Sequence, residues 1–247
     1  MIRGRRVCAL VPARGGSKGI PRKNLLKIGG MTLLERALTL AQACPTVDRV
    51  YVSTDDAEAY ALAKLHGCDT PHLRPATLAT DRSRTIDVVR HLVREGPIGA
   101  DDIILLVQPT SPIRTREELN AICDLLDRTW DETDAIVSVC KIDGPHPYKA
   151  QLIENGVLRS LFGAESTVPR QSLPETFLPN GAFYLGKYSV LDAENTFIPA
   201  RSLAYIMPPL ASVNLDGPLD QLLLEALLEK GMVQLDSPEQ TTQQSQA

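Results

Sequence analysis

The stretch VCALVPARGGSKGIPRKN, residues 7–24, decides the fold class and raises the question of function. It joins a short, continuous apolar run to a loop with three glycines and four basic residues, Arg14, Lys18, Arg22 and Lys23. An apolar run that ends at a glycine loop is typical of a buried parallel strand. Because an amphipathic segment follows, the sequence predicts a strand, a loop and then a helix.

The same unit repeats along the chain. We expect further strands at residues 49–54, 102–107, 134–139, 182–186, 203–207 and 210–215. We expect helices at residues 31–44, 57–67, 85–96, 116–129 and 218–231. Alternating strands and helices predict an α/β protein whose open, mostly parallel sheet is covered by helices on both faces.

The domain organisation follows from length and local composition. A chain of 247 residues can bury one sizeable core. Residues 143–179 contain prolines at 145, 147, 169 and 174 and no clean periodicity, so we interpret them as a small insertion or arm. Residues 236–247 are polar, and we expect them to be disordered. The prediction is therefore one domain over residues 1–235, with an insertion and a disordered tail.

Composition excludes several classes of protein. The net charge is -4, so the basic cluster is local, and we expect neither a nucleic-acid partner nor a membrane partner. The five cysteines are scattered without a C-x-x-C pair, which favours reduced thiols in a cytoplasmic protein. No apolar run reaches transmembrane length, and we find no secretory signal.

Four loops that follow predicted strands carry polar or charged side chains. They are residues 14–24, 54–56, 108–114 and 214–220. Ligands of open α/β sheets bind beyond the carboxyl ends of the strands, where such loops meet. We therefore expect these four loops to form one site.

The basic loop fits neither of the common nucleotide-binding motifs, because neither G-x-x-x-x-G-K-[ST] nor G-x-G-x-x-G can be written over it. Glycines nevertheless let backbone N–H groups approach an anion, and Arg and Lys supply the charge that a triphosphate needs. The alternative is a solvated basic loop. The order of strand, glycines and bases favours phosphate binding.

Asp216 stands between a predicted strand and the last helix, and two interpretations stay open. Its carboxylate suits Mg²⁺, which proteins commonly hold with one or two carboxylates and the phosphates of a substrate. Equally, Asp216 or Asp220 could simply cap the helix.

The loop at residues 108–114 also has two interpretations. Gln108, Thr110, Ser111 and Arg114 could orient a polar ligand at the end of a strand. The sequence Pro-Thr-Ser-Pro is also ordinary turn chemistry, and on its own it favours a turn.

Six motifs, taken in order, resemble the acylneuraminate cytidylyltransferases, which are the CMP-sialic acid synthetases of bacterial type. They are ARGGSKGIPRKN, VSTDD, LRPATLATD, LLVQPTSPIR, VPRQSLPETFLPNGAFYL and SVNLDGPLD. The resemblance extends over residues 7–228, nearly the whole chain. The related Kdo cytidylyltransferases have a different glycine loop and rank below.

The resemblance implies a Rossmann-like nucleotidyltransferase fold and a homodimer in which the insertion at residues 143–179 is a dimerisation arm. It also implies a reaction: CTP and a nine-carbon 2-keto sugar acid, a nonulosonic acid, give the CMP-sugar and pyrophosphate. N-acetylneuraminate is the sugar expected first, and legionaminate, pseudaminate and Kdn are alternatives that the motifs do not separate. A further alternative is a non-catalytic protein that binds CTP.

The resemblance also assigns residues to roles. Those assigned to the nucleotide are Arg14, Gly15, Ser17, Lys18, Lys23, Asn24, Arg74 and Thr85. Those assigned to the sugar acid are Gln108, Lys149, Arg170, Gln171, Asn180, Tyr184 and Phe197, of which the three in the insertion would reach the partner protomer's site. Those expected to be catalytic are Arg14, Lys23 and Asp216.

One departure from the family pattern concerns the metal. The family usually has D-x-D before the last helix, whereas this chain has Asn214-Leu215-Asp216. The resemblance implies Mg²⁺ or another divalent cation on Asp216 and Asn214. Because an amide oxygen brings no charge, it is a weaker metal ligand than a second carboxylate.

Overall fold

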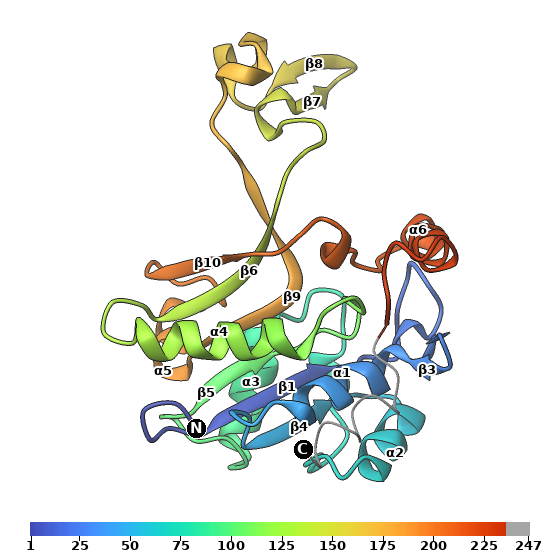
Figure 1. Ribbon diagram of the computed structural model, residues 1–247, viewed down its shortest axis with the longest axis vertical. Coiled ribbons are helices and arrows are strands. Elements are labelled where there is room, and N and C mark those ends of the chain that lie inside the picture. Colours follow the sequence, from blue (N-terminus) through green and yellow to red (C-terminus); the bar gives the residue numbers. More distant parts are fainter. Residues whose placement is uncertain (236–247) are drawn as a thin grey trace.

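Six strands form the central sheet of the computed structural model, which describes residues 1–235 (Figure 1). The strand order is β10-β6-β9-β5-β1-β4. Their bounds are β1 Val7–Pro12, β4 Arg49–Ser53, β5 Ile103–Leu106, β6 Ala135–Lys141, β9 Phe177–Lys187 and β10 Ser202–Ile206. Only β9 runs antiparallel to its neighbours, so the predicted mostly parallel sheet is confirmed.

Within residues 1–235, six α-helices accompany this sheet. They are α1 Leu33–Ala43, α2 Ala57–Leu65, α3 Thr85–Arg94, α4 Arg116–Arg128, α5 Tyr188–Glu194 and α6 Pro218–Glu229. All five predicted helices are present, and α5 was not predicted. Capping boxes start α1 and α4: Thr32 accepts from the Glu35 N–H, and Thr115 accepts from the Glu118 N–H. Each cap satisfies backbone donors that have no partner within the helix.

Strand β1 is buried on both faces, because its side chains alternate between two layers of helices. Val7, Ala9 and Val11 pack in the core that includes α1, α2 and α4. Cys8 and Leu10 pack in the opposite core, which includes α3 and α5. The result is a sheet covered on both faces, as the continuous apolar run predicts.

A third core lies under α6 and fixes the basic loop. Leu224 and Leu227 of α6 pack in one cluster with Ile20 of the basic loop and Leu33 of α1. This packing brings the N-terminus of α6 beside the loop that follows β1.

The prediction of a strand at residues 210–215 is wrong. Leu210–Ser212 form a 3-10 turn, which begins at Pro209 with φ -55° and ψ -40°. Val213 is extended, and the Leu215 N–H donates to the Thr110 carbonyl at 2.8 Å. Because prolines at 208 and 209 lack the N–H that a sheet needs, the apolar run ends in a loop rather than joining the sheet edge.

Strands β6 and β9 continue beyond the sheet and carry residues 142–176 into a projecting arm (Figure 1). The arm holds a two-stranded hairpin, β7 Gln151–Glu154 and β8 Val157–Ser160. Asn155 and Gly156 join these strands with φ of 51° and 80°, which is the conformation of a tight type I′ turn. The arm overlaps the predicted insertion at residues 143–179, whose last three residues belong to β9.

Two sequence-based predictions concern other parts of the chain. The expected disordered tail, residues 236–247, lies outside the described residues. Within residues 1–235, none of the helices combines the length and the apolar character needed to span a bilayer.

Candidate active site

The four predicted loops meet at the carboxyl ends of β1, β4 and β5. The Gly15 N–H donates to the Asp55 carboxylate at 2.9 Å, which joins the basic loop to the loop after β4. Lys23 Nζ donates to the Leu215 carbonyl at 2.6 Å. Since the Leu215 N–H bonds to Thr110, the basic loop, the loop after β5 and the segment before α6 form one unit.

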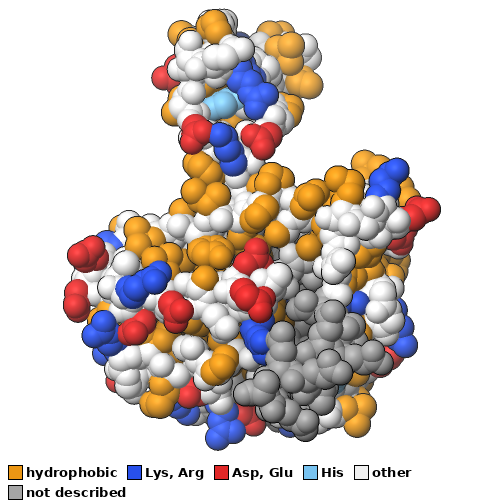
Figure 2. Space-filling model, viewed as in Figure 1, with side chains coloured by type: hydrophobic (Ala, Val, Ile, Leu, Met, Phe, Trp, Pro, Cys, Tyr) orange, Lys and Arg blue, Asp and Glu red, His pale blue; other side chains and the backbone are white. Residues whose placement is uncertain are grey.

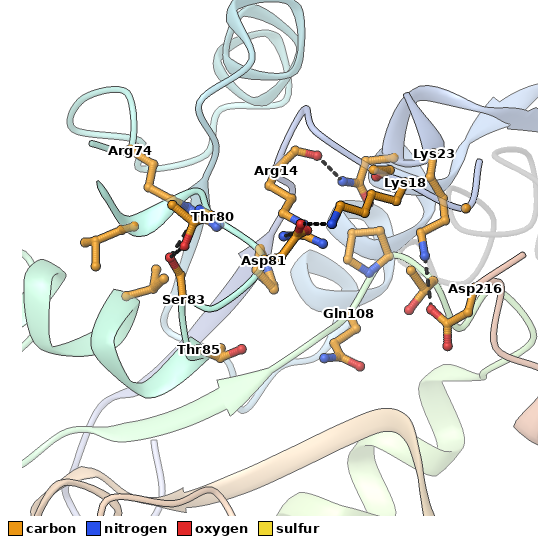
Figure 3. Close-up of a pocket in the computed structure, with 18 residues that line it drawn as sticks. Arg14, Lys18, Lys23, Arg74, Thr80, Asp81, Ser83, Thr85, Gln108 and Asp216 are labelled. Carbon is orange, nitrogen blue, oxygen red and sulfur yellow. Dashed lines mark hydrogen bonds and ion pairs between the residues drawn. The ribbon is translucent and has the colours of Figure 1, made fainter. Parts of the chain in front are cut away.

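A pocket of about 380 Å³ opens where these loops meet (Figure 3). Nine of the predicted site residues line it: Arg14, Ser17, Lys18, Lys23, Asn24, Arg74, Thr85, Gln108 and Asp216. Thr110, which the sequence offered as a ligand contact or as part of a turn, also lines the pocket, together with residues that were not predicted as ligand contacts, among them Gly19, Thr80, Asp81 and Ser83. Gly15 is not in the lining, and its N–H is taken by Asp55.

Two cations of the pocket share one carboxylate. Asp81 Oδ1 lies 2.9 Å from Arg14 Nη1, and Asp81 Oδ2 pairs with Lys18 Nζ. The hydrogen bond from Lys18 is the main cause that lowers the pKa of Asp81, and Arg14 lowers it further. Asp81 is therefore held as an anion against the basic loop.

The third basic-loop cation that lines the pocket, Lys23, faces the segment before α6. Its ammonium lies 3.1 Å from Asp216 Oδ1. The Lys23 side chain is only 13% exposed, whereas that of Asp216 is 72% exposed. Lys23 is therefore held in place by the protein, and Asp216 presents its carboxylate to the pocket and to solvent.

Asp220, not Asp216, caps α6. Asp220 Oδ2 accepts from the backbone N–H groups of Asp216 at 2.8 Å and of Gly217 at 2.7 Å. The carboxylate of Asp216 is left for Lys23 and for Asn214 Nδ2, which donates to Asp216 Oδ2 at 2.7 Å. The capping interpretation thus applies to Asp220, and Asn214 orients Asp216.

Gly19 allows the basic loop to touch the segment before α6. A Cβ built on Gly19 would lie 1.9 Å from the Asp216 carbonyl oxygen, closer than any side chain can approach. Every other residue type would therefore force the two segments apart. Gly19 was quoted as part of the loop, but the sequence gives no sign of this contact, because its partner lies almost 200 residues away.

Arg74 is a buried cation in the pocket wall. It is 8% exposed, Nε donates to Ser53 Oγ at 2.9 Å, and Nη2 donates to the Ser53 carbonyl. Burial lowers the pKa of Arg74 to about 10, with a smaller effect from Arg14. These bonds fix the guanidinium at the end of β4.

Two other basic residues of the loops have structural partners outside the pocket. Arg22 pairs with Glu58 at 2.7 Å and with Asp56 at 3.4 Å. Arg114 is buried; its Nη1 donates to the Ala182 carbonyl at 2.7 Å, and burial lowers its pKa to about 9. Arg114 therefore joins the loop after β5 to β9 and does not line the pocket.

The residues predicted for the sugar acid are divided between several places. Gln108 lines the pocket. Tyr184 of β9 pairs in register with Leu106 of β5, and its ring lies 6.0 Å from the ring of Phe197, edge to face. Neither aromatic ring lines the pocket, although both pack in the core that also contains the pocket residue Val88.

Asn180 has its polar atoms engaged within the fold. Its Oδ1 accepts from Ser138 Oγ at 2.6 Å and from the Ala182 N–H at 3.1 Å. Its Nδ2 donates to Ser212 Oγ at 2.9 Å. These bonds stabilise the irregular part of β9, where the register against β6 shifts.

Three predicted sugar contacts lie in the arm and do not line the pocket of their own chain (Figure 1). Lys149 Nζ donates to the Ser166 carbonyl at 2.7 Å and to the Val168 carbonyl. Arg170 Nη2 donates to the Asp143 carbonyl at 2.7 Å. Gln171 follows in the short 3-10 turn Arg170–Ser172.

The donor set for a cation is small. Within residues 1–235 there is no group of three or more His, Cys, Asp or Glu side chains that could hold a metal ion. Asn214 Oδ1 accepts from Ser111 Oγ at 3.3 Å, so the amide oxygen is turned toward Ser111 and away from Asp216. Of Asn214 and Asp216, only Asp216 offers a carboxylate to a cation, and its side chain is 72% exposed.

The basic, glycine-containing pocket lies beyond the carboxyl ends of the strands, which is where open α/β sheets bind their ligands. The fold of the chain also resembles the folds of solved synthetases and synthases. The synthetase of CMP:2-keto-3-deoxy-manno-octonic acid, solved with CTP, has a TM-score of 0.64 at 17% identity over 92% of this chain and 99% of that one. A 4-diphosphocytidyl-2C-methyl-D-erythritol synthase has a TM-score of 0.61 at 18% identity, over 91% and 99%. These likenesses establish the Rossmann-like nucleotidyltransferase fold.

The family model described as cytidylyltransferase matches residues 8–144, and the chain belongs to that family. It is 30% identical to the N-acylneuraminate cytidylyltransferase of Escherichia coli O18:K1:H7, over 91% of this chain and 52% of that protein. It is 29% identical to the enzyme of the same name from Oncorhynchus mykiss, over 95% and 53%. A Helicobacter pylori protein named for pseudaminic acid cytidylyltransferase and a hydrolase is 27% identical, over 83% and 39%. The chain spans about half the length of the curated relatives it matches, or less.

Proposed function

We propose that the protein transfers CMP from CTP to the anomeric C2 hydroxyl of a nonulosonic acid, with N-acetylneuraminate as the expected acceptor. One observation carries this proposal: Arg14, Lys18 and Lys23 line a single pocket on a glycine loop, opposite Asp216. Three cations suit the charge of a triphosphate. The names of the relatives support cytidine as the base and a nonulosonate as the acceptor.

The pocket would act by positioning and by neutralising charge. In the reaction the C2 oxygen forms a bond to the α-phosphorus, the bond from that phosphorus to the bridging oxygen of pyrophosphate breaks, and the hydroxyl proton leaves to solvent or a base. We propose that Arg14 and Lys18 hold the β- and γ-phosphates. Lys23, which is nearly buried, would hold the oxygens that gain charge as pyrophosphate leaves.

We infer that Arg74 and Thr85 contact the nucleoside. Arg74 is fixed by two bonds to Ser53 at the end of β4, and Thr85 begins α3, so both are held in place by the fold. A base site built on such elements would select cytosine by shape and hydrogen bonding rather than by net charge.

We propose that Asp216 binds a divalent cation, with Mg²⁺ expected. Two observations support this proposal: the Asp216 side chain is 72% exposed, and its Oδ1 already pairs with a cation, the Lys23 ammonium, at 3.1 Å. Mg²⁺ would neutralise charge on the phosphate oxygens and would make pyrophosphate a better leaving group. The protein supplies a single carboxylate, which Asn214 orients through its amide N–H, so phosphate oxygens would complete the ligands.

We propose that the protein is a homodimer joined through the arm. Ile153 and Leu158, which face each other across the hairpin, are 74% and 67% exposed. Figure 2 shows further hydrophobic side chains on the arm and on the surface of the main body directly below the arm. An isolated hairpin with exposed apolar residues needs a partner to cover it. In such a dimer Lys149, Arg170 and Gln171 would serve the site of the partner protomer.

We infer a cytoplasmic location, because the five cysteines, all within the described residues, form no disulfide.

The experiment is to measure pyrophosphate release from CTP and Mg²⁺ with N-acetylneuraminate, legionaminate, pseudaminate, Kdn and Kdo, each offered separately. We expect release with one nonulosonate above the others and little with Kdo. CTP binding without release for any of these sugars would contradict the proposal and favour a non-catalytic CTP-binding protein.

A further inference from the structure

Asp81 places a negative charge inside a pocket that we assign to a polyanion. Its two carboxylate oxygens pair with two cations of the pocket, Oδ1 with Arg14 and Oδ2 with Lys18 (Figure 3). A carboxylate that bridges two cations in this way uses the same donors that a phosphate group would use. Asp81 therefore pairs with the two cations that we expect to bind the ligand's phosphate groups.

A tight turn presents this carboxylate. The Ser83 N–H donates to the Thr80 carbonyl at 3.1 Å, and the Thr80 N–H donates to Ser83 Oγ at 3.1 Å. Ser83 Oγ also donates to the Thr77 carbonyl at 3.2 Å. Because the turn is closed by its own hydrogen bonds, Asp81 stays beside the basic loop when its ion pairs are exchanged.

The two ion pairs are solvated, which makes them exchangeable. The side chains of Arg14, Lys18 and Asp81 are 35%, 81% and 42% exposed. Ion pairs of this exposure stabilise a protein only slightly. A ligand with several negative charges can therefore displace Asp81, but it must do so against the attraction of both cations.

We propose that Asp81 is an internal competitor of the substrate phosphates. It pairs with Arg14 and Lys18 in the free protein, yields them to the triphosphate, and takes them back as pyrophosphate leaves. Asp81 acts through the two cations and is thus a positioning residue that limits how tightly the pocket retains pyrophosphate. This inference rests on the proposed function, because it requires that the pocket bind phosphate groups.

The test is titration calorimetry with inorganic pyrophosphate, in EDTA and without a divalent cation. The variants are Asp81→Asn and, as a matched control, Glu58→Gln, which removes a carboxylate paired with Arg22 of the same loop outside the pocket. Asp81→Asn removes the two exposed ion pairs that compete with pyrophosphate for Arg14 and Lys18, so we expect this variant to bind pyrophosphate about two- to tenfold more tightly than the parent. The gain should shrink as salt rises, and Glu58→Gln should bind like the parent.

The direction of the change separates this role from a structural one. A residue that merely holds the turn would weaken pyrophosphate binding when it is replaced, so equal or weaker binding to Asp81→Asn would overturn the inference. Asp81→Glu keeps the charge and should stay near the parent; tightening in that variant too would also overturn it. Asp81→Ser, expected to tighten as well, replaces Asp81→Asn if thermal unfolding shows that the latter is not folded. If the parent bound neither pyrophosphate nor CTP, with or without Mg²⁺, the proposed function itself would fail.

Discussion

Gly19→Ala tests whether the contact between the basic loop and the segment before α6 assembles the site. The added Cβ would lie 1.9 Å from the Asp216 carbonyl oxygen, and a Cβ essentially never comes within 3.0 Å of such an atom, so the gap must open by at least about 1.1 Å. That movement would separate Asp216 from Lys23, which now lie 3.1 Å apart. A misplacement of about 1 Å can reduce a rate by about 100-fold.

The assay is the kcat/KM for CTP in pyrophosphate release, with far-UV circular dichroism to confirm folding. Gly16→Ala is the matched control, because a Cβ on Gly16 meets nothing within 4 Å and its φ is not positive. We expect a loss of about 100-fold for Gly19→Ala and activity near the parent for Gly16→Ala. Equal kcat/KM for the two variants would refute the reasoning.

Three further predictions address other parts of the molecule. Asp216→Ala should lose Mg²⁺-dependent turnover and keep its unfolding temperature, whereas Asp220→Ala should lose about 1 kcal/mol of stability with its helix cap; the opposite pattern in turnover and calorimetry would show that the roles are exchanged. Ile153→Asp should shift sedimentation from dimer toward monomer, and Leu65→Asp, an exposed leucine on α2, should not; equal sedimentation of the two would contradict an interface at the arm. Burial holds the pKa of His91 below its ordinary value, so stability should be complete above about pH 6.5 and decline as the pH falls through the lowered pKa; an unfolding temperature that falls as steeply from pH 7 to pH 5 in His91→Gln would exclude His91 as the cause.

The elements that the sequence predicted are those with a local signal. Strand β1 is a continuous apolar run because both of its faces are buried, and the pattern records this directly. The glycines and bases of the first loop lie next to one another in the chain, so their joint role could be inferred from proximity alone. α5 was missed because seven residues give too few turns for a periodic pattern.

The arm shows why other elements escaped prediction. The hairpin strands β7 and β8 are exposed on both faces, so no core imposes an alternation of apolar and polar side chains. The pair Asn155 and Gly156 is the strongest local signal for such a turn and could have revealed it. The roles of Gly19 and Asp81 depend on contacts between segments that are distant in sequence, and a single sequence carries no trace of these contacts.

The question of the two aspartates before α6 also needed the structure. Spacing left open whether Asp216 holds a metal ion or whether Asp216 or Asp220 only caps the helix, because both stand near the helix start. The hydrogen bonds assign the cap to Asp220 and turn the carboxylate of Asp216 toward Lys23. Which of the two aspartates can contact a ligand thus depends on the direction of each side chain, and sequence spacing does not specify that direction.

The most direct test of cytidylyl transfer is product identification in competition. The protein would be incubated with N-acetylneuraminate, Mg²⁺ and equal amounts of CTP, UTP, ATP and GTP, and the products read by mass spectrometry. Our account predicts the CMP-sugar as the main nucleotide sugar, with one pyrophosphate formed for each. Absence of any nucleotide sugar, or a main product that carries another base, would contradict it.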